Sequence, residues 1–513
     1  MIKNRFYCLD CGPRRRVTHV RRDSIAMNRL DDEKRRSVGC QGDAWQMGFG
    51  GGLERNVKCL DSCDRAVPIT PSESLSQTDI QVAASGVRLP ASRFIPRCAG
   101  LASSALWLVF APASGMADPI YDRETNVAVR DRDHPEYDAL GVTAGVLRIF
   151  PRVATALTFD DNIYAITAKT ADFFVDLHPS VELRSLWSRN DLHLVLDYDA
   201  ARYVSHPAQD TASYSGNLTG RLDVDRDASV TVDLSAARAI QPRISQNSIA
   251  GVLKPISYDL VKGDIVGLKV FDRIRASARF DVSHYSYDNT NDLNAVPVQE
   301  DYQDRDELVG TTHVDYAISP ATAFFVEGAI NSHSYRLRPP LAPFQRDSHG
   351  YDVLAGVDFA PTHLIGGTVG IGYESQSYDD HQFDGVSGLA LRGALRWYAT
   401  PLVTVTLRAN RTFQDSGLPN VAAARFTEAS LAADYELLRN VILGGRLVRQ
   451  VYQYPGINGR TDRYGGALDA TYTLNRDVSI ILAYTYLEQR SAGANSGLSF
   501  NDNRASLTVT FRR

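Results

Sequence analysis

Apolar and polar residues alternate with a period of two along most of the chain, from about residue 141 to the C-terminus. In Val403–Asn410, valine, leucine and alanine alternate with threonine, arginine and asparagine. The same alternation runs through Tyr214–Asp225, Ser229–Ala236 and Ala505–Phe511. Successive side chains of a strand point to opposite faces, so each segment is predicted to be a β-strand with one apolar and one polar face.

The connections between these segments alternate between short and long. The short ones consist of turn-forming residues: Arg189-Asn190, Asp225–Asp227, Asp272-Arg273, Ser319-Pro320, Pro361–His363, Thr400-Pro401, Arg439-Asn440 and Asn475–Asp477. The longer, polar ones include Gln241–Leu253, Asn289–Gln303, Arg338–Ser348, Asp379–Val386, Asp415–Ala424 and Ser491–Asp502. Eight tight turns and nine longer loops give about 18 strands, and this even number predicts that both termini lie in the periplasm.

These strands are predicted to cross a membrane. No stretch approaches about 20 consecutive apolar residues, which excludes a helical membrane protein. The mean hydropathy of −0.23 fits a transmembrane barrel, because only every second residue of a strand meets lipid. Lipid offers no hydrogen-bond partners, so strands can cross it only as a closed ring. The predicted fold is an all-β, transmembrane, antiparallel up-and-down barrel over residues 141–513.

Aromatic residues near the ends of the segments fit the interfacial girdles of such a barrel. They are Tyr164, Tyr198, Tyr214, Tyr258, Tyr316, Trp397, Tyr435, Tyr464, Tyr472 and Tyr486. Ordinary strand aromatics of a soluble sheet are the alternative interpretation.

The first 117 residues differ from the rest in composition. They contain all six cysteines and all four methionines, and they carry 17 Lys and Arg against 11 Asp and Glu. With −5 for the whole chain, the remaining 396 residues have a formal charge of −11. Arg93 and Arg97 precede the short apolar run Ala99–Phe110, and small residues follow up to Ala117. This pattern predicts a secretion signal over residues 87–117.

Secretion signals stand at the start of a precursor, so residues 1–86 are predicted to be a non-native extension from a wrong start, or disordered. An alternative is a zinc site, since thiolates at these spacings can complete a tetrahedron: Cys8, Cys11, Cys59 and Cys63. Residues 118–140 are polar and aperiodic and are predicted to form a periplasmic segment ahead of the barrel.

The barrel segment offers no catalytic motif. Its histidines are scattered, without metal-site or Ser-His-Asp spacing, and no Gly-rich nucleotide-binding loop is present. His193 and His313 fall on the polar face, two residues from Asp191 and Asp315, as expected for a wet barrel interior. Asp160–Asn162 could bind calcium, although an acidic pair at a strand end is more often solvated. We predict no enzyme activity, no cofactor, no metal and no nucleic-acid partner.

Arginines on the polar faces are the candidate functional residues. Arginine outnumbers lysine by 34 to 4 after residue 117. Guanidinium groups bind carboxylates and sulfates as planar forks. The candidates are Arg221, Arg275, Arg279, Arg392, Arg396, Arg408 and Arg446. Two interpretations remain open: the arginines pair with interior acids, or they form a cationic track for an anionic polymer. The acids in question are Asp223, Asp281, Asp434 and Asp469.

Short motifs spread over roughly residues 125–511 point to a family. They are Val129–Gly141, Phe150-Pro151, Leu157–Tyr164, Asp172–Pro179, Leu183–Arg189, Gly220–Asp227, Asp304–Glu307, Ser348–Tyr351, Trp397–Leu402, Leu438–Asn440 and Tyr472–Arg476. As a set they resemble the "Putative beta-barrel porin 2" family of bacterial outer-membrane proteins. The resemblance implies an outer-membrane barrel, often associated with surface-polysaccharide production, and no enzyme chemistry.

Three functions follow from these observations as hypotheses. The first is a passive conduit that exports an anionic exopolysaccharide; the others are a general diffusion porin and a structural or adhesive surface barrel. The expected partners are outer-membrane lipid, the polysaccharide with its periplasmic export proteins, and the barrel-assembly machinery. The terminal aromatic Phe511 fits recognition by that machinery, although Arg512 and Arg513 follow it.

Overall fold

The structure is a computed structural model that describes residues 4–6, 17–18, 127–245, 252–292, 296–339, 344–416, 421–493 and 498–513. In the first 117 residues it describes β1 (Asn4–Phe6) and β2 (Val17–Thr18), which pair antiparallel. The predicted secretion signal and the six cysteines lie outside the described residues. No helix within the described ranges is long and apolar enough to span a membrane.

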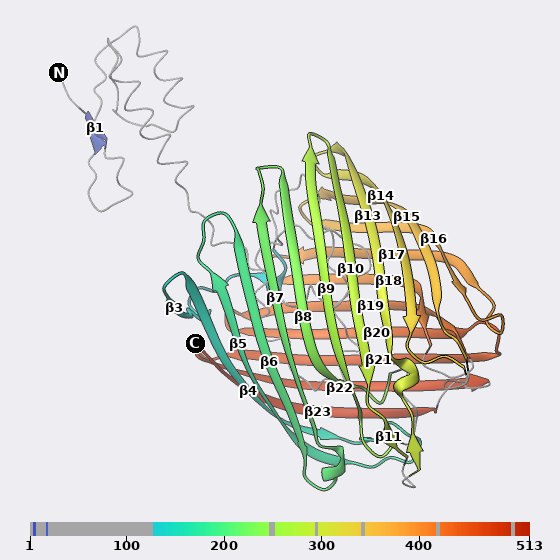
Figure 1. Cartoon of the computed structure of the whole chain (residues 1–513). Coiled ribbons are helices and arrows are strands. Elements are labelled where there is room, and N and C mark those ends of the chain that lie inside the picture. The colour runs from blue at the N-terminus through green and yellow to red at the C-terminus, as the bar shows by residue number, and fades with distance from the viewer. Residues whose placement is uncertain are drawn as a thin grey trace. The chain divides into compact units, whose positions relative to one another are not determined.

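Eighteen antiparallel strands close into one barrel (Figure 1). Each strand pairs with its neighbours in the sequence, so the predicted all-β, up-and-down topology and strand number are confirmed. The strands are β4 (Leu147–Asp160), β5 (Asp172–Ser185), β6 (Asp191–Tyr203), β7 (Thr211–Asp223), β8 (Ala228–Gln241), β9 (Ile256–Phe271), β10 (Ile274–Tyr287), β13 (Arg305–Ser319), β14 (Thr322–Tyr335), β15 (Ser348–Thr362), β16 (Ile365–Tyr378), β17 (Val386–Thr400), β18 (Val403–Asp415), β19 (Ala423–Leu438), β20 (Val441–Tyr454), β21 (Gly459–Thr473), β22 (Val478–Gly493) and β23 (Phe500–Arg512).

Smaller elements decorate this wall. The short strand β3 (Val142–Ala144) pairs with the beginning of β4. Within the connection between β10 and β13, β11 (Thr290–Asn291) pairs with β12 (Pro297–Val298). Three single-turn 3-10 helices are described: η2 (Val129–Asp131), η3 (Pro207–Gln209) and η4 (Asp301–Gln303).

The barrel closes where its last strand pairs with its first. β23 runs antiparallel to β4, with Leu507 opposite Leu157 and Phe511 opposite Val153. Every wall strand therefore has two neighbours, so the ring presents no open edge to lipid. In Figure 1, β17 to β23 cross behind β4 to β10 at a steep angle, as the strand tilt of a barrel requires.

The two rims of the barrel differ in the length of their connections. All eight predicted tight turns join strands at one rim, here called the turn rim, and examples are Asp272-Arg273 and Arg439-Asn440. The start of β4 and the end of β23 lie at this same rim. The longer connections leave their strands at the opposite rim, here called the loop rim; two examples follow Gln241 at the end of β8 and Tyr287 at the end of β10.

The wall has an apolar outside and a polar inside, the reverse of a soluble sheet. Large apolar side chains such as Leu389, Leu407 and Leu447 are exposed, whereas Thr404 and Gln450, on the other face of β18 and β20, are almost inaccessible. This arrangement follows directly from the period-two pattern when the surroundings are lipid.

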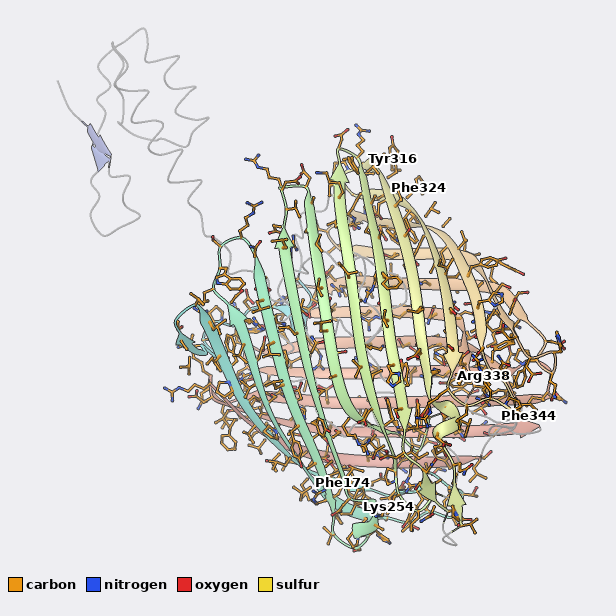
Figure 2. All side chains as sticks on the ribbon, viewed as in Figure 1. Phe174, Lys254, Tyr316, Phe324, Arg338 and Phe344 are labelled. Carbon is orange, nitrogen blue, oxygen red and sulfur yellow. The ribbon has the colours of Figure 1, made fainter. Side chains whose placement is uncertain are left out.

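Exposed aromatic side chains lie near both rims. Those near the turn rim include Phe271, Tyr316, Phe324, Trp397, Tyr435, Tyr472 and Phe511, and those near the loop rim include Phe173, Tyr214, Tyr351 and Tyr373. Figure 2 shows Tyr316 and Phe324 at one end of the barrel and Lys254, Arg338 and Phe344 at the other. Two aromatic bands separated by an apolar zone are typical of a membrane-spanning barrel.

Candidate functional site in the barrel interior

The seven arginines selected from the sequence lie on the strand face that carries the buried polar side chains, here called the interior face. They are Arg221 on β7, Arg275 and Arg279 on β10, Arg392 and Arg396 on β17, Arg408 on β18 and Arg446 on β20. They divide into two groups: four lie within 3.0 Å of a wall carboxylate, and the remaining three lie close to one another on neighbouring strands.

Arg221 and Arg279 pair with carboxylates of the wall. The Nε of Arg221 donates to Asp223 at 2.7 Å. Arg279 donates to Asp281 at 2.8 Å and to Asp264 at 3.0 Å. The structure therefore shows the pairing with interior acids that the sequence left open for Asp223 and Asp281.

A network of five side chains connects β10, β13, β14 and β17. The Nε of Arg275 donates to Asp315 at 2.9 Å, and Arg392 donates to Glu327 at 2.8 Å. Between them, the ring nitrogens of His313 lie 3.0 Å from each of these two carboxylates. The imidazole can donate to both only when both nitrogens carry protons. In that state the three cations and two carboxylates leave one net positive charge on the interior face.

Strand register creates this network. Arg275 lies directly opposite Asp315, and His313 lies directly opposite Glu327. The sequence shows that His313 and Asp315 share a strand face, but it does not identify Glu327 as the second partner of His313. Period-two patterning assigns faces and leaves the pairing of distant strands open, so no signal in the sequence brings Glu327 to His313.

Arg396, Arg408 and Arg446 form the second group, here called the arginine cluster. Arg408 lies opposite Ala394, one interior position from Arg396. Ala432 of β19 is paired on one side with Thr406 and on the other with Arg446. The three guanidinium groups therefore lie within one small area of the wall, where like charges repel. The buried Nε of Arg408 has no hydrogen-bond acceptor among the described residues.

Residues 127–138, here called the N-terminal segment, lie against the interior face next to this cluster. The Asp131 carboxylate is 4.0 Å from Arg396, and the Val129 amide donates to the Thr404 hydroxyl at 3.1 Å. Arg132 donates to Glu436 at 2.8 Å. Val129 is fully buried. From the sequence, residues 118–140 are predicted to be a periplasmic segment ahead of the barrel, whereas residues 127–138 contact the interior face of the wall; the polar, aperiodic pattern gives no indication of these contacts.

Arg130 of this segment sits between two wall carboxylates. It donates to Asp434 at 2.5 Å and to Asp469 at 2.8 Å. Burial lowers the pKa of the guanidinium, but the two carboxylates outweigh burial and raise this pKa above its ordinary value. Asp434 and Asp469 therefore both pair with Arg130 of the N-terminal segment, a partner that the sequence does not predict.

Gly444 makes room for this ion pair. It lies directly between Asp434 and Asp469 across β19, β20 and β21, opposite each of them in register. A Cβ atom at Gly444 would overlap both the Arg130 guanidinium and the Asp469 carboxylate. Asp434, Gly444 and Asp469 thus form a site shaped for a guanidinium, here called the cradle.

Two arginines from the C-terminal part of the wall also contact the N-terminal segment. Arg512 donates to the Tyr137 carbonyl at 3.1 Å, and Arg476 donates to the Pro135 carbonyl at 2.9 Å. A small pocket lies between the segment and the ends of β19 to β23 at the turn rim. It is lined by Arg130, His134, Tyr137, Asp138, Arg439, Asn440, Ile442, Thr471, Thr473 and Arg512.

Within the described part of the chain, two clusters of acidic side chains, one of them with a histidine, have the spacing of metal ligands, and side-chain cations contact both. Asp160 and Asp502 lie close together at the loop rim, where Arg504 reaches them at 2.9 and 3.0 Å. Lys169 lies 2.7 Å from the neighbouring Asp161. These cations supply the positive charge that the calcium interpretation of Asp160–Asn162 assigned to a metal.

The second cluster is Glu307, His333 and Asp415. Glu307 accepts from Arg305 at 2.7 Å, and Asp415 lies 2.6 Å from the Nδ1 of His333. Both carboxylates of this cluster are therefore already in contact with a basic side chain of the protein. The expectation that the barrel needs no metal and has no enzyme activity stays a prediction.

Comparisons with known proteins identify the family. The family model described as "Putative beta-barrel porin 2" matches residues 134–513. No curated protein matches the chain.

Among solved structures, the outer membrane protein opdK from Pseudomonas aeruginosa is 9% identical, with a TM-score of 0.39 and coverage of 71% of this chain and 98% of that chain. OccAB3 from Acinetobacter baumannii is 11% identical, with a TM-score of 0.39 and coverage of 71% and 99%. A BenF-like porin from Pseudomonas fluorescens Pf-5 is 9% identical, with a TM-score of 0.42 and coverage of 71% and 99%. The match of the family model to residues 134–513 shows that the chain belongs to the "Putative beta-barrel porin 2" family of outer-membrane, porin-like barrels.

Proposed function

We propose that this barrel is a conduit for anionic saccharides and that its cargo is an exported exopolysaccharide. The arginine cluster carries the proposal. Three guanidinium groups share one area of the interior face, and the Asp131 carboxylate of the N-terminal segment lies 4.0 Å from Arg396. Such a cluster attracts carboxylate or sulfate groups of a polymer.

The rest of the interior suits passage better than tight binding. Arg221 and Arg279 are already paired with wall carboxylates, so these parts of the wall are polar but nearly neutral. An acidic polymer is therefore attracted where guanidinium groups are concentrated and is released where each guanidinium is already paired with a carboxylate. Conduction requires this balance, since a site that binds too strongly stops the flow.

A diffusion porin for small anions is the second candidate. The position of the N-terminal segment favours it, because a segment packed on the interior face obstructs a polymer more than a small solute. A structural or adhesive barrel would show no conductance and would still bind glycans at the cell surface.

Planar-bilayer recordings of the purified protein test the conduit. We expect anion-selective conductance that acidic uronate oligosaccharides block transiently. The triple variant Arg396→Gln, Arg408→Gln, Arg446→Gln should lose both properties. Arg449→Gln is the matched control, because Arg449 is on β20 with Arg446 but is exposed on the opposite face. Unchanged selectivity and block in the triple variant would refute the role of the cluster.

A gene deletion in the producing organism separates the two conduits. Export of a polysaccharide predicts a large loss of extracellular polymer on deletion, with recovery on complementation. Undiminished extracellular polymer, combined with anion conductance in bilayers, would replace the export function with the small-anion porin.

A further inference from the structure

We propose that the N-terminal segment is a removable plug: Arg130 docks in the cradle of Asp434, Gly444 and Asp469, and the barrel conducts at its full rate only when the segment leaves the interior face. The plug and its docking site are both parts of this chain. The inference concerns the gating of the interior and rests on the proposed function only for the identity of the displacing solute.

The contacts of the segment cover a large part of the wall at one rim. They reach from Arg396 on β17 and Thr404 on β18 to Arg512 on β23. The residues involved lie near the turn-rim ends of their strands. A segment bonded along this stretch of wall narrows the opening that a solute must pass at the turn rim.

The cradle is specific for the segment. Three consecutive strands present carboxylate, glycine and carboxylate at directly opposed positions, and the Arg130 guanidinium fills the space above the glycine. The backbone of Gly444 does not have a positive φ. Because the backbone conformation at this position is open to any residue, the strand itself does not require glycine. The missing Cβ instead leaves the space that the Arg130 guanidinium occupies.

The docking is ionic and can therefore be reversed. Arg130, Asp131 and Arg132 each meet an opposite charge of the wall, and Val129 contributes the main apolar anchor. Charged groups that separate into a polar interior regain water, and salt screens their attraction. Asp131 also presents to Arg396 the same carboxylate group that an acidic saccharide carries, so the cargo competes with the segment for the cluster.

Filling the cradle tests the plug. Gly444→Ala places a methyl group where the Arg130 guanidinium docks. Gly445→Ala is the matched control, since its Cβ would meet only Leu468 at an ordinary 3.5 Å. In the folded, full-length protein in bilayers, we expect Gly444→Ala to raise single-channel conductance several-fold and Gly445→Ala to leave it unchanged. Trypsin should cleave after Arg130 and Arg132 several-fold faster in Gly444→Ala than in the wild type, and at the wild-type rate in Gly445→Ala.

Arg130→Gln provides a second variant that leaves the wall unchanged. It should raise the conductance in the same way and should make the conductance less dependent on salt. Wild-type conductance in both variants, or unchanged cleavage after Arg132 in both, would overturn the plug. If the conductance rises but acidic oligosaccharides do not block either variant, the plug stands and the proposed cargo fails.

Discussion

Arg275 of β10 and Asp315 of β13 occupy directly opposed positions of the wall, and the guanidinium donates to the carboxylate at 2.9 Å with both side chains almost inaccessible to solvent. Removal of one member of a buried ion pair leaves the other charge without its partner. The pair is therefore a sensitive point of the interior.

Arg275→Met should lower the free energy of unfolding by about 3 kcal/mol. Urea unfolding in lipid vesicles, followed by tryptophan fluorescence, measures this change. Arg238→Met is the control, because the partners Asp259 and Asp288 are more than half exposed and an exposed pair contributes less than about 1 kcal/mol. Equal losses in the two variants would contradict the importance of burial.

Leu447 reports on the apolar outside of the barrel. It lies near the middle of β20 and is 62% exposed. Leu447→Arg should destabilise the barrel in vesicles by about 2–4 kcal/mol, since a charge at the bilayer midplane must leave water. Val204→Arg, in the connection between β6 and β7, should cost less than about 1 kcal/mol. If Leu447→Arg left the free energy of unfolding unchanged, this face of the barrel would be in contact with water and not with lipid.

The connection between β10 and β13 should weaken as the pH rises. Burial raises the pKa of the Glu300 carboxyl from 4.5 to about 7, with Asp301 adding to this rise and the hydrogen bond from Gln303 opposing it. Between these two pH values the folded loop keeps a proton that the unfolded loop has released. Its stability is therefore fully present below pH 4.5 and is lost as the pH rises towards 7.

Hydrogen exchange checks this dependence on pH. The Gln303 amide donates to the Glu300 carbonyl, so its protection reports on the loop. After correction for intrinsic exchange, protection should fall from pH 4.5 to 7 in the wild type and stay constant in Glu300→Gln. Protection that increased over this range would show the opposite linkage.

Calcium should leave the wild-type barrel unaffected. Arg504 lies close to both Asp160 and Asp502, so the same Tm is expected in calcium and in chelator. Arg504→Gln should lower the Tm because two buried carboxylates lose their cation. Millimolar calcium should then restore part of the loss. A wild-type Tm that rises by several degrees with calcium would instead identify Asp160–Asn162 as a metal site.

The sequence predicts the wall of this protein far better than its interior contacts. Alternation and turn chemistry locate the eight tight turns, the even strand number and the face on which each of the seven arginines lies, because these features are local. Contacts across the interior are not local. Arg130 and Asp434 are separated by 304 residues, and their pairing depends on the register of strands that the sequence pattern leaves open.

The N-terminal segment shows the same limit. Its charged residues are visible in the sequence, but their partners lie on β17 to β21. Gly444 carries no signal of its own, since glycine is common in this chain. Only the opposed positions of Asp434 and Asp469 give it a role.

The seam between β4 and β23 has a consequence for biogenesis. The first wall strand, β4, bonds on one side to β23, so the ring cannot be sealed until β23 has been synthesised. A chain that stopped before β23 would have two strand edges with unpaired backbone N–H and C=O groups, and such edges are prone to aggregation. Closure by β23 thus requires that all the wall strands are present before the barrel is sealed in the bilayer.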